Sequence, residues 1–387
     1  YDYNSSGSAL SQVTTNRKFL DTNCWYHLVW RVDTTQSTAA DRLRFYVNGV
    51  QETSFNNTNY PGQNNNYLYS ESITAQYFGQ RADQGNTSSF DGCMSHIHMC
   101  DGYSYAASEF GETDSTTGEW KIKTTPSVSY GTNGYWILKD GNTVTDSSPN
   151  SNDFAVTGTL TKTEDCPSNV FATMNPLNVP TSNAPSFSNG STKTVTAGSS
   201  GRFGGTSTLG MSSGKFYVEA KATVSSNPRN CIGTTYDPGT QARNNSTHYS
   251  YADGISYNAE TGDVVNSSGT IYSASTYTTG DIIQMAIDMD NDKLYFGKNG
   301  TWLNSGDPTS GSTGTGAVSL TANKTQFIIQ SDNTSGSDQS TFEFNFGNGY
   351  FGTTAVSSAG TNASNIGIFE YNVPTGYTAL STKGLNL

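Results

Sequence analysis

Residues 282–300 decide the fold, and they read IIQMAIDMDNDKLYFGKNG. The first six residues form an apolar run with the length of a buried strand, and this run ends at Asp288. A second apolar run, Leu294-Tyr295-Phe296, returns after a polar turn, and Asn299-Gly300 marks the next turn. The stretch therefore predicts an antiparallel hairpin whose tight turn lies at Asn291-Asp292.

The same design occurs near the beginning of the chain. Leu28, Trp30 and Val32 alternate with the residues between them, residues 42–47 form a second alternating run, and Asn48-Gly49 follows. This pattern predicts a hairpin with one apolar face. Two copies about 250 residues apart indicate two domains of related architecture, because self-similarity usually reports repeated structural units.

The composition favours short strands and many turns over helices. Only 13% of the residues are charged, well below the roughly 25% of typical domains, so the polarity comes from Ser, Thr, Asn and Gly. Those residue types favour turns, whereas Tyr and Phe fit half-buried strands. Further candidate strands at 215–222, 325–330 and 341–346 are each bounded by Gly, Ser or Asn. We therefore expect an all-β protein of two tandem antiparallel β-sandwich domains.

The region between the two hairpins is predicted to be an ordered connector. Residues 126–185 are rich in Pro, Ser, Thr and Asn, which interrupt both strand and helix patterns. Within it, residues 135–138 (YWIL) and 154–156 (FAV) are predicted to be strands that dock on a neighbouring sheet. The expected domains are therefore residues 1–125 and residues 186–387.

The motifs of the first domain resemble a laminin-G-like, concanavalin-type domain. The resemblance rests on residues 21–30 (DTNCWYHLVW) and 45–49 (FYVNG). Residues 110–120 with 130–135 resemble the extension that such domains carry in structural proteins of marine and environmental bacteriophages. Residues 165–176 are similar to the linker of those same proteins.

The motifs of the second domain resemble a SPRY domain, another twisted β-sandwich. They are residues 214–219 (GKFYVE), residues 287–302, and the ending at 369–377, which is similar to the segment that closes a SPRY domain. The resemblance covers nearly the whole chain and implies two jelly-roll, concanavalin-like sandwiches. A complete laminin-G-like domain would have several strands before Trp25, so we expect these upstream of Tyr1 or supplied by another subunit through strand addition.

The resemblance implies a virion structural protein. We expect a tail fibre, spike or other surface appendage that contacts other virion subunits and binds host-surface glycans or proteins, as a homo-oligomer because such assemblies are symmetric. One alternative is a capsid decoration or assembly protein, a head fibre or cement, which an exposed apolar patch or a borrowed strand would favour. A second alternative is a glycan-cleaving enzyme, which would need paired carboxylates in a cleft.

Charge and hydropathy argue against several other functions. The net charge is −12 with only 20 Lys and Arg, so we expect no nucleic-acid binding. No apolar run reaches the roughly 18 residues that cross a bilayer, so no membrane insertion is expected. No phosphate-binding loop and no Ser-His-Asp arrangement can be singled out. The densest acidic cluster, Glu109, Glu112, Asp114 and Glu119, lies among Gly, Ser and Thr and is predicted to be a solvated loop rather than a catalytic pair. The chain is therefore expected to be non-enzymatic and without cofactor.

Two clusters contain atoms that could bind a metal. Asp288, Asp290 and Asp292 alternate, but carboxylates at a hairpin bend more often accept local backbone hydrogen bonds.

The second cluster, Cys93, His96, His98 and Cys100, lies in a short run in which Ile97 and Met99 are expected to face a core and the histidines to lie outward or under the connector. No metal site is therefore predicted. The five cysteines are an odd number spread widely, and we expect buried thiols rather than disulfides.

A candidate ligand surface lies in residues 244–258. Tyr249, Tyr251 and Tyr257 occur there in a polar stretch that is predicted to be a loop with one strand. Saccharide rings stack on exposed tyrosines, and SPRY domains bind ligands through loops on one side of the sandwich, so these three residues are the predicted ligand contacts. The alternative is that the tyrosines cover the sheet.

Overall fold

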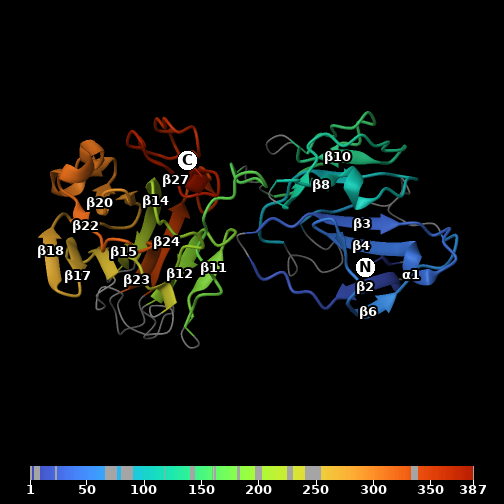
Figure 1. Cartoon of the computed structure of the whole chain (residues 1–387), viewed down its shortest axis with the longest axis horizontal. Coiled ribbons are helices and arrows are strands. Elements are labelled where there is room, and N and C mark those ends of the chain that lie inside the picture. Colours follow the sequence, from blue (N-terminus) through green and yellow to red (C-terminus); the bar gives the residue numbers. More distant parts are fainter. Residues whose placement is uncertain are drawn as a thin grey trace. The chain divides into compact units, whose positions relative to one another are not determined.

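The computed structural model describes two compact units in one chain (Figure 1). The described residues are 2–3, 9–21, 24–65, 76–79, 90–116, 118–139, 144–158, 160, 163–180, 184–196, 203–224, 230–239, 254–332 and 339–386. Unit 1 comprises Tyr1–Leu20 and Cys24–Lys162, and unit 2 comprises Asp21–Asn23 and Thr163–Leu387. Residues 126–185, the predicted connector, are thus divided between the two units.

Unit 2 is a sandwich of two sheets whose strands are almost all antiparallel. The larger sheet contains, in spatial order, β11 (Ser186–Ser188), β12 (Lys193–Val195), β24 (Ser340–Asn345), β14 (Lys215–Val224), β19 (Ile282–Asp288), β20 (Lys293–Lys298) and β21 (Thr301–Trp302), with β22 (Val318–Ser319) beside β20 and β27 (Thr378–Ala379) parallel to β14. The smaller sheet contains β13 (Phe203–Thr206), β23 (Phe327–Asp332), β15 (Asn230–Thr235), β16 (Gly254–Asn258), β17 (Asp263–Asn266) and β18 (Gly269–Ser273). A separate hairpin consists of β25 (Tyr350–Phe351) and β26 (Thr354–Ala355).

The hairpin predicted at residues 282–300 is confirmed. β19 pairs with β20 on one side, with Ile287 opposite Leu294, and with β14 on the other. All of β19 is buried, which explains why apolar residues occupy both of its faces, with Gln284 and the terminal Asp288 as the exceptions. The other strands predicted for this domain are present as β14, β23 and β24, with ends shifted by one or two residues.

The core of unit 2 lies between the two sheets. It combines Phe216, Val218, Met285 and Phe344 from the larger sheet with Ile232, Tyr257 and Ile328 from the smaller one. The residues predicted to be a linker also belong to this core, because Phe171, Ala172 and Met174 are fully buried in it. The backbone N–H of Ala172 donates to the carbonyl of Leu380, which joins this segment to the C-terminal end of the chain.

A buried carboxylate joins β14 to the segment that closes unit 2. Glu219 Oε1 accepts hydrogen bonds from the Tyr217 hydroxyl at 2.9 Å and from the Tyr371 backbone N–H at 2.8 Å, and Oε2 accepts one from the Glu370 backbone N–H at 2.8 Å. Burial raises the pKa of Glu219 to about 7, although the two backbone hydrogen bonds act in the opposite direction.

Unit 1 consists of small antiparallel sheets. One sheet contains β1 (Asp2–Tyr3), β2 (Ala9–Thr15) and β6 (Phe55–Asn59), and a second contains β3 (Leu28–Val32), β4 (Leu43–Val47) and β5 (Val50–Gln51). Two further pairs are β7 (Ile97–Met99) with β10 (Tyr135–Ile137), and β8 (Gly111–Thr113) with β9 (Trp120–Ile122). The hairpin predicted at residues 28–47 is therefore confirmed as β3 and β4.

The two strands predicted inside the connector have different outcomes. Residues 135–137 form β10, as predicted. Residues 154–156 do not form a strand, and that prediction was wrong. Side-chain amides hold the surrounding loop instead, because Asn150 Nδ2 donates to the carbonyls of Gly131 and Gly134. The Phe154 ring then packs edge-on against Tyr135, with ring centroids 4.8 Å apart.

The all-β fold class is confirmed. The helical segments are short: they include α1 (Ala39–Arg42) and the 3-10 helices Ala107–Glu109, Leu303–Ser305, Pro308–Thr313 and Gly384–Asn386. Among the described residues there is no helix with the length and apolar character needed to cross a membrane.

Candidate interaction site

The predicted ligand tyrosines do not form a described surface. Tyr249 and Tyr251 lie outside the described residues. Tyr257 is on β16 and is fully buried. Its hydroxyl donates to the carbonyl of Ser275, and its ring lies 4.8 Å from that of Tyr277. Tyr257 therefore packs in the core, as in the alternative considered for these tyrosines, because its position on β16 points it between the two sheets.

The aspartates of the β19–β20 turn serve the backbone, as predicted. Asp288 is fully buried, its Oδ1 accepts the N–H groups of Asp290 and Asn291, and its Oδ2 pairs with Lys215 Nζ at 2.9 Å. Asp290 Oδ1 accepts the N–H of Gly214. The described residues contain no group of three or more His, Cys, Asp or Glu side chains arranged to hold a metal ion.

The acidic cluster lies on and around the β8–β9 hairpin. Glu112 is exposed on β8, and Asp114 and Glu119 are hydrogen-bonded through their backbones across the turn. Asp114 accepts the N–H of Thr116 and pairs with Lys121 Nζ at 2.6 Å. All four residues were predicted to lie in a solvated loop. Glu112 lies instead on the short strand β8 and Glu109 in the 3-10 helix Ala107–Glu109, although both side chains are exposed.

The cysteine prediction was correct on disulfides and wrong on burial. The five cysteines all lie in described ranges and none forms a disulfide. Only Cys231 is buried, whereas Cys24 and Cys93 are exposed. The exposed pair lie in irregular segments rather than on core-facing strand positions.

His98 packs under the connector, as predicted for the histidines of this run. Its ring stacks on Trp136 with centroids 5.1 Å apart, and its Nδ1 is 2.9 Å from the Tyr130 hydroxyl. Burial lowers the pKa of His98 to about 4, so the ring is neutral near neutral pH.

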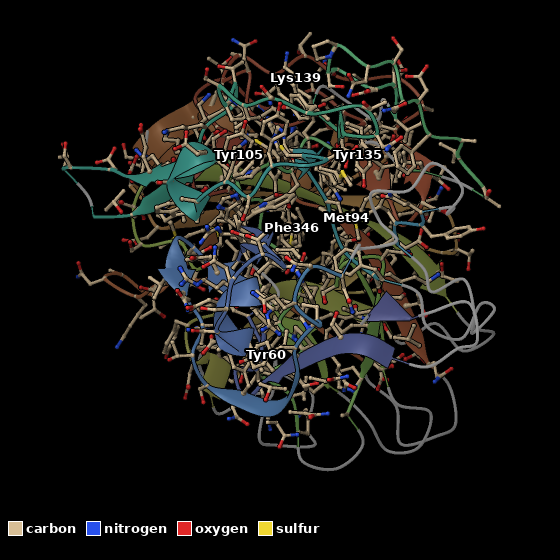
Figure 2. The ribbon with its side chains drawn as sticks, turned by 90° about the vertical axis from the view of Figure 1, so that its right-hand side faces the viewer. Tyr60, Met94, Tyr105, Tyr135, Lys139 and Phe346 are labelled. Atoms are coloured by element: carbon tan, nitrogen blue, oxygen red, sulfur yellow. The ribbon has the colours of Figure 1, made fainter. Side chains whose placement is uncertain are left out.

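The same cluster of rings continues to the surface. Phe110 contacts both His98 and Tyr105, and Tyr105 stacks on Tyr103 with centroids 5.6 Å apart and planes at 12°. Tyr103 is 50% exposed. Figure 2 labels Tyr105, together with Lys139, whose ammonium lies over the Trp136 ring at 4.8 Å.

The clearest surface feature of unit 1 is the edge strand β3. It pairs with β4 with Trp30 opposite Phe45, and among the described residues no strand pairs with its outer side (Figure 1). His27 O accepts the N–H of Asn48, and Asp33 N–H donates to Arg42 O. Because bonded and non-bonded positions alternate in an antiparallel pair, the backbone groups of residues 28, 30 and 32 point away from β4.

On the apolar face of this hairpin, the side chains of β4 are buried, whereas two of those of β3 are exposed to solvent. Leu43, Phe45 and Val47 are buried on that face of β4. Their direct partners Leu28 and Trp30 lie on the same face, yet they are 52% and 47% exposed. Two large apolar side chains at an unpaired strand edge form a surface of the kind that binds another polypeptide.

The opposite face of the same hairpin has two arginines directly across from each other. Arg31 on β3 is paired in register with Arg44 on β4. Arg44 Nη2 binds the Asp41 carboxylate at 2.8 Å, whereas Arg31 Nε binds the neutral Ser104 hydroxyl at 2.9 Å. The neighbouring carboxylate of Asp33 accepts hydrogen bonds from Thr35 and Gln36. On this face of the hairpin, the Arg31 guanidinium is therefore a cation with no direct carboxylate contact among the described residues.

The sequence identified β3 as an alternating strand but not as an exposed edge. Alternation reports which side chains share a face, and it does not report which neighbours cover that face.

Comparisons with known proteins add little to this description. No family model matches the chain, and no curated protein matches it. Among solved structures, the SPRY domain of human HERC1 is 16% identical over 39% of this chain and 81% of that domain, with a TM-score of 0.28. The stonustoxin structure is 15% identical over 46% of this chain and 27% of that chain, with a TM-score of 0.33. TM-scores this low carry no argument about function, and neither protein bears on the laminin-G-like resemblance.

Proposed function

We propose that this chain is a non-enzymatic structural protein of a bacteriophage particle, a tail fibre, spike or other surface appendage that binds host-surface glycans or proteins. Its support is the ordered series of motifs that resemble phage structural proteins, together with the all-β architecture. The exposed apolar edge of β3 supports a role as a subunit of a particle, since it offers a surface for contact with another subunit, and the half-exposed Tyr103 ring stacked on Tyr105 is the observation that carries host attachment in particular.

Attachment to a host would work by many weak contacts. A symmetric appendage presents several copies of each site, and linked weak sites gain avidity without any new contact. For a saccharide ligand, the described surface that fits best is Tyr103 stacked on Tyr105, because a half-exposed aromatic ring backed by a second ring is a preformed stacking platform.

A second candidate function is capsid decoration or assembly. A protein that grips neighbouring subunits needs an apolar patch or a strand edge, and β3 offers both at one place. In this case the particle surface, rather than a host receptor, would be the main partner.

The position of the chain on purified particles separates the two candidates. Gold-labelled antibodies against residues 186–387, viewed by electron microscopy, are expected to mark tail tips or projecting fibres. Label distributed over the head would favour decoration over host attachment. The absence of label from every particle would contradict the phage assignment itself.

A further inference from the structure

Three features of β3 together indicate what kind of strand would pair with its outer edge. Its outer backbone groups face away from β4, its residues Leu28 and Trp30 expose apolar surface on one face, and Arg31 lies on the other face. An added strand would satisfy the backbone groups, cover the apolar side chains and place an alternate residue opposite Arg31.

A second copy of this chain fits β3 poorly. The self-pairing that uses the whole strand is antiparallel and centred on Trp30, which places each Leu28 opposite a Val32. That register also makes the two Arg31 residues diagonal neighbours on one face, and it adds them to the two Arg44 residues already opposite them. Like charges so arranged are destabilising, so the charge of β3 disfavours its own copy.

We propose that β3 is completed by an extended strand from a different polypeptide, in which large apolar residues alternate with acidic residues. The apolar side chains would lie beside Trp30, and a carboxylate would lie opposite Arg31. The proposal deepens the proposed function, on which it rests for the source of the strand, a different subunit of the particle.

The energetic reason is that both faces of the added strand gain contacts. Covering Leu28 and Trp30 removes apolar surface from water, which favours association. A carboxylate at Arg31 forms a charge-assisted bond and also offsets the repulsion between Arg31 and Arg44. A carboxylate opposite Arg31 therefore adds affinity, and the alternation of apolar and acidic residues fixes which face of the partner strand meets each face of β3.

The test uses the full chain and a fluorescein-labelled peptide of alternating valine and glutamate. Fluorescence anisotropy is expected to show saturable binding of this peptide. A peptide of the same composition, with its valines and glutamates in two separate blocks, should bind about tenfold more weakly, since it cannot place apolar and acidic side chains on opposite faces.

Two variants locate the binding at β3. Trp30→Thr should weaken binding, whereas Ile271→Thr on the exposed edge strand β18 should not. Because Trp30 also contacts Phe45, a charge reversal provides an independent readout. Arg31→Glu should lower the affinity for the valine–glutamate peptide about tenfold. The same variant should bind a valine–lysine peptide more tightly than the parent chain does.

Three results would overturn the proposal. They are equal binding of the alternating and block peptides, no effect of Arg31→Glu on the preference between glutamate and lysine, and self-association of the chain that Trp30→Thr abolishes. The last result would make a second copy the occupant of β3. These measurements use purified protein, so binding at β3 together with unlabelled particles would contradict the virion role alone.

Discussion

At the scale of single residues, Glu219 is the most constrained side chain of unit 2. Its two carboxylate oxygens accept hydrogen bonds from the backbone N–H groups of Glu370 and Tyr371, and no other residue type offers two acceptors in that shape. Glu219→Gln keeps the shape but places an amide NH₂ against one of the two N–H groups. We expect a loss of about 1–3 kcal/mol in the free energy of unfolding.

Urea unfolding followed by tyrosine and tryptophan fluorescence measures this loss. Glu260→Gln is the matched control, because Glu260 is exposed on the turn after β16. Equal unfolding midpoints for Glu219→Gln and the parent chain would show that the buried carboxylate does not hold the closing segment.

A second residue-scale prediction concerns Tyr103. If the chain binds saccharides through described residues, the stacked pair of Tyr103 and Tyr105 is the platform. Tyr103→Ala should then reduce glycan binding about tenfold, since one stacked ring contributes on the order of 1 kcal/mol or more. Glycan-array screening with Tyr77→Ala as the control, another exposed tyrosine of unit 1, checks this. Undiminished binding by Tyr103→Ala would place the saccharide elsewhere.

At the scale of elements, Trp120 joins two hairpins of unit 1. Its Nε1 donates to His27 Nδ1 at 2.8 Å, and its ring lies against the backbone of Gly49 and Gly111. A Cβ atom on Gly111 would lie 2.5 Å from the ring, so Gly111→Ala must displace Trp120. We expect unit 1 to lose about 1–3 kcal/mol of stability.

Displacement of the Trp120 ring would change its surroundings, and near-ultraviolet circular dichroism detects such a change. Near-ultraviolet circular dichroism should lose tryptophan signal in Gly111→Ala and keep it in Glu112→Ala, an exposed position on the same strand β8 that is paired with Lys121 rather than with Trp120. Trp120→Phe removes the hydrogen bond to His27 and also shortens the ring that lies against Gly49 and Gly111, so a cost of about 1–3 kcal/mol is expected. An unchanged spectrum in Gly111→Ala would show that the Trp120 ring keeps its place, and it would contradict the predicted displacement.

At the scale of the whole molecule, the position of the boundary between the two units predicts which fragment of the chain folds alone. Phe171, Ala172 and Met174 are buried in the core of unit 2, so residues 163–387 should fold when expressed alone. Residues 186–387 lack these three side chains and should fail to fold cooperatively, since a buried Phe and Met each contribute roughly 2–5 kcal/mol. Thermal unfolding of the two fragments compares them. Equal stability would place the boundary at the end of the predicted connector instead.

The two units should also respond in opposite ways to acid. Glu219 has a raised pKa, so its stabilisation is complete below pH 4.5 and is lost as the pH rises through about 7. His98 has a lowered pKa, so its contribution is complete above pH 6.5 and is lost as the pH falls towards about 4. Between pH 7 and pH 5, unit 2 should therefore gain stability while unit 1 loses it.

Differential scanning calorimetry of the full chain tests this as two transitions that move in opposite directions. Glu219→Gln should remove the acid-induced gain of unit 2, and His98→Asn should remove the acid-induced loss of unit 1. Two transitions that move together with pH would show that neither buried group controls this range.

The sequence by itself determined the fold class, both hairpins and the strands β14, β23 and β24 of unit 2. Turn residues and side-chain alternation are local properties, and they dictate where a strand ends and which side chains share a face. The same local chemistry placed Asp288 at a backbone turn. It also ruled out any dense cysteine framework.

Only the tertiary structure decided what covers each face. Tyr257 was predicted at a ligand surface but is buried, residues 171–174 were predicted in a linker but lie in a core, and Trp30 is exposed although its face of β4 is buried. Each of these outcomes depends on residues far apart in the chain, and no local pattern contains that information. Burial is a property of neighbours in space, and for this reason the candidate site at β3 appeared only when the strands were assembled.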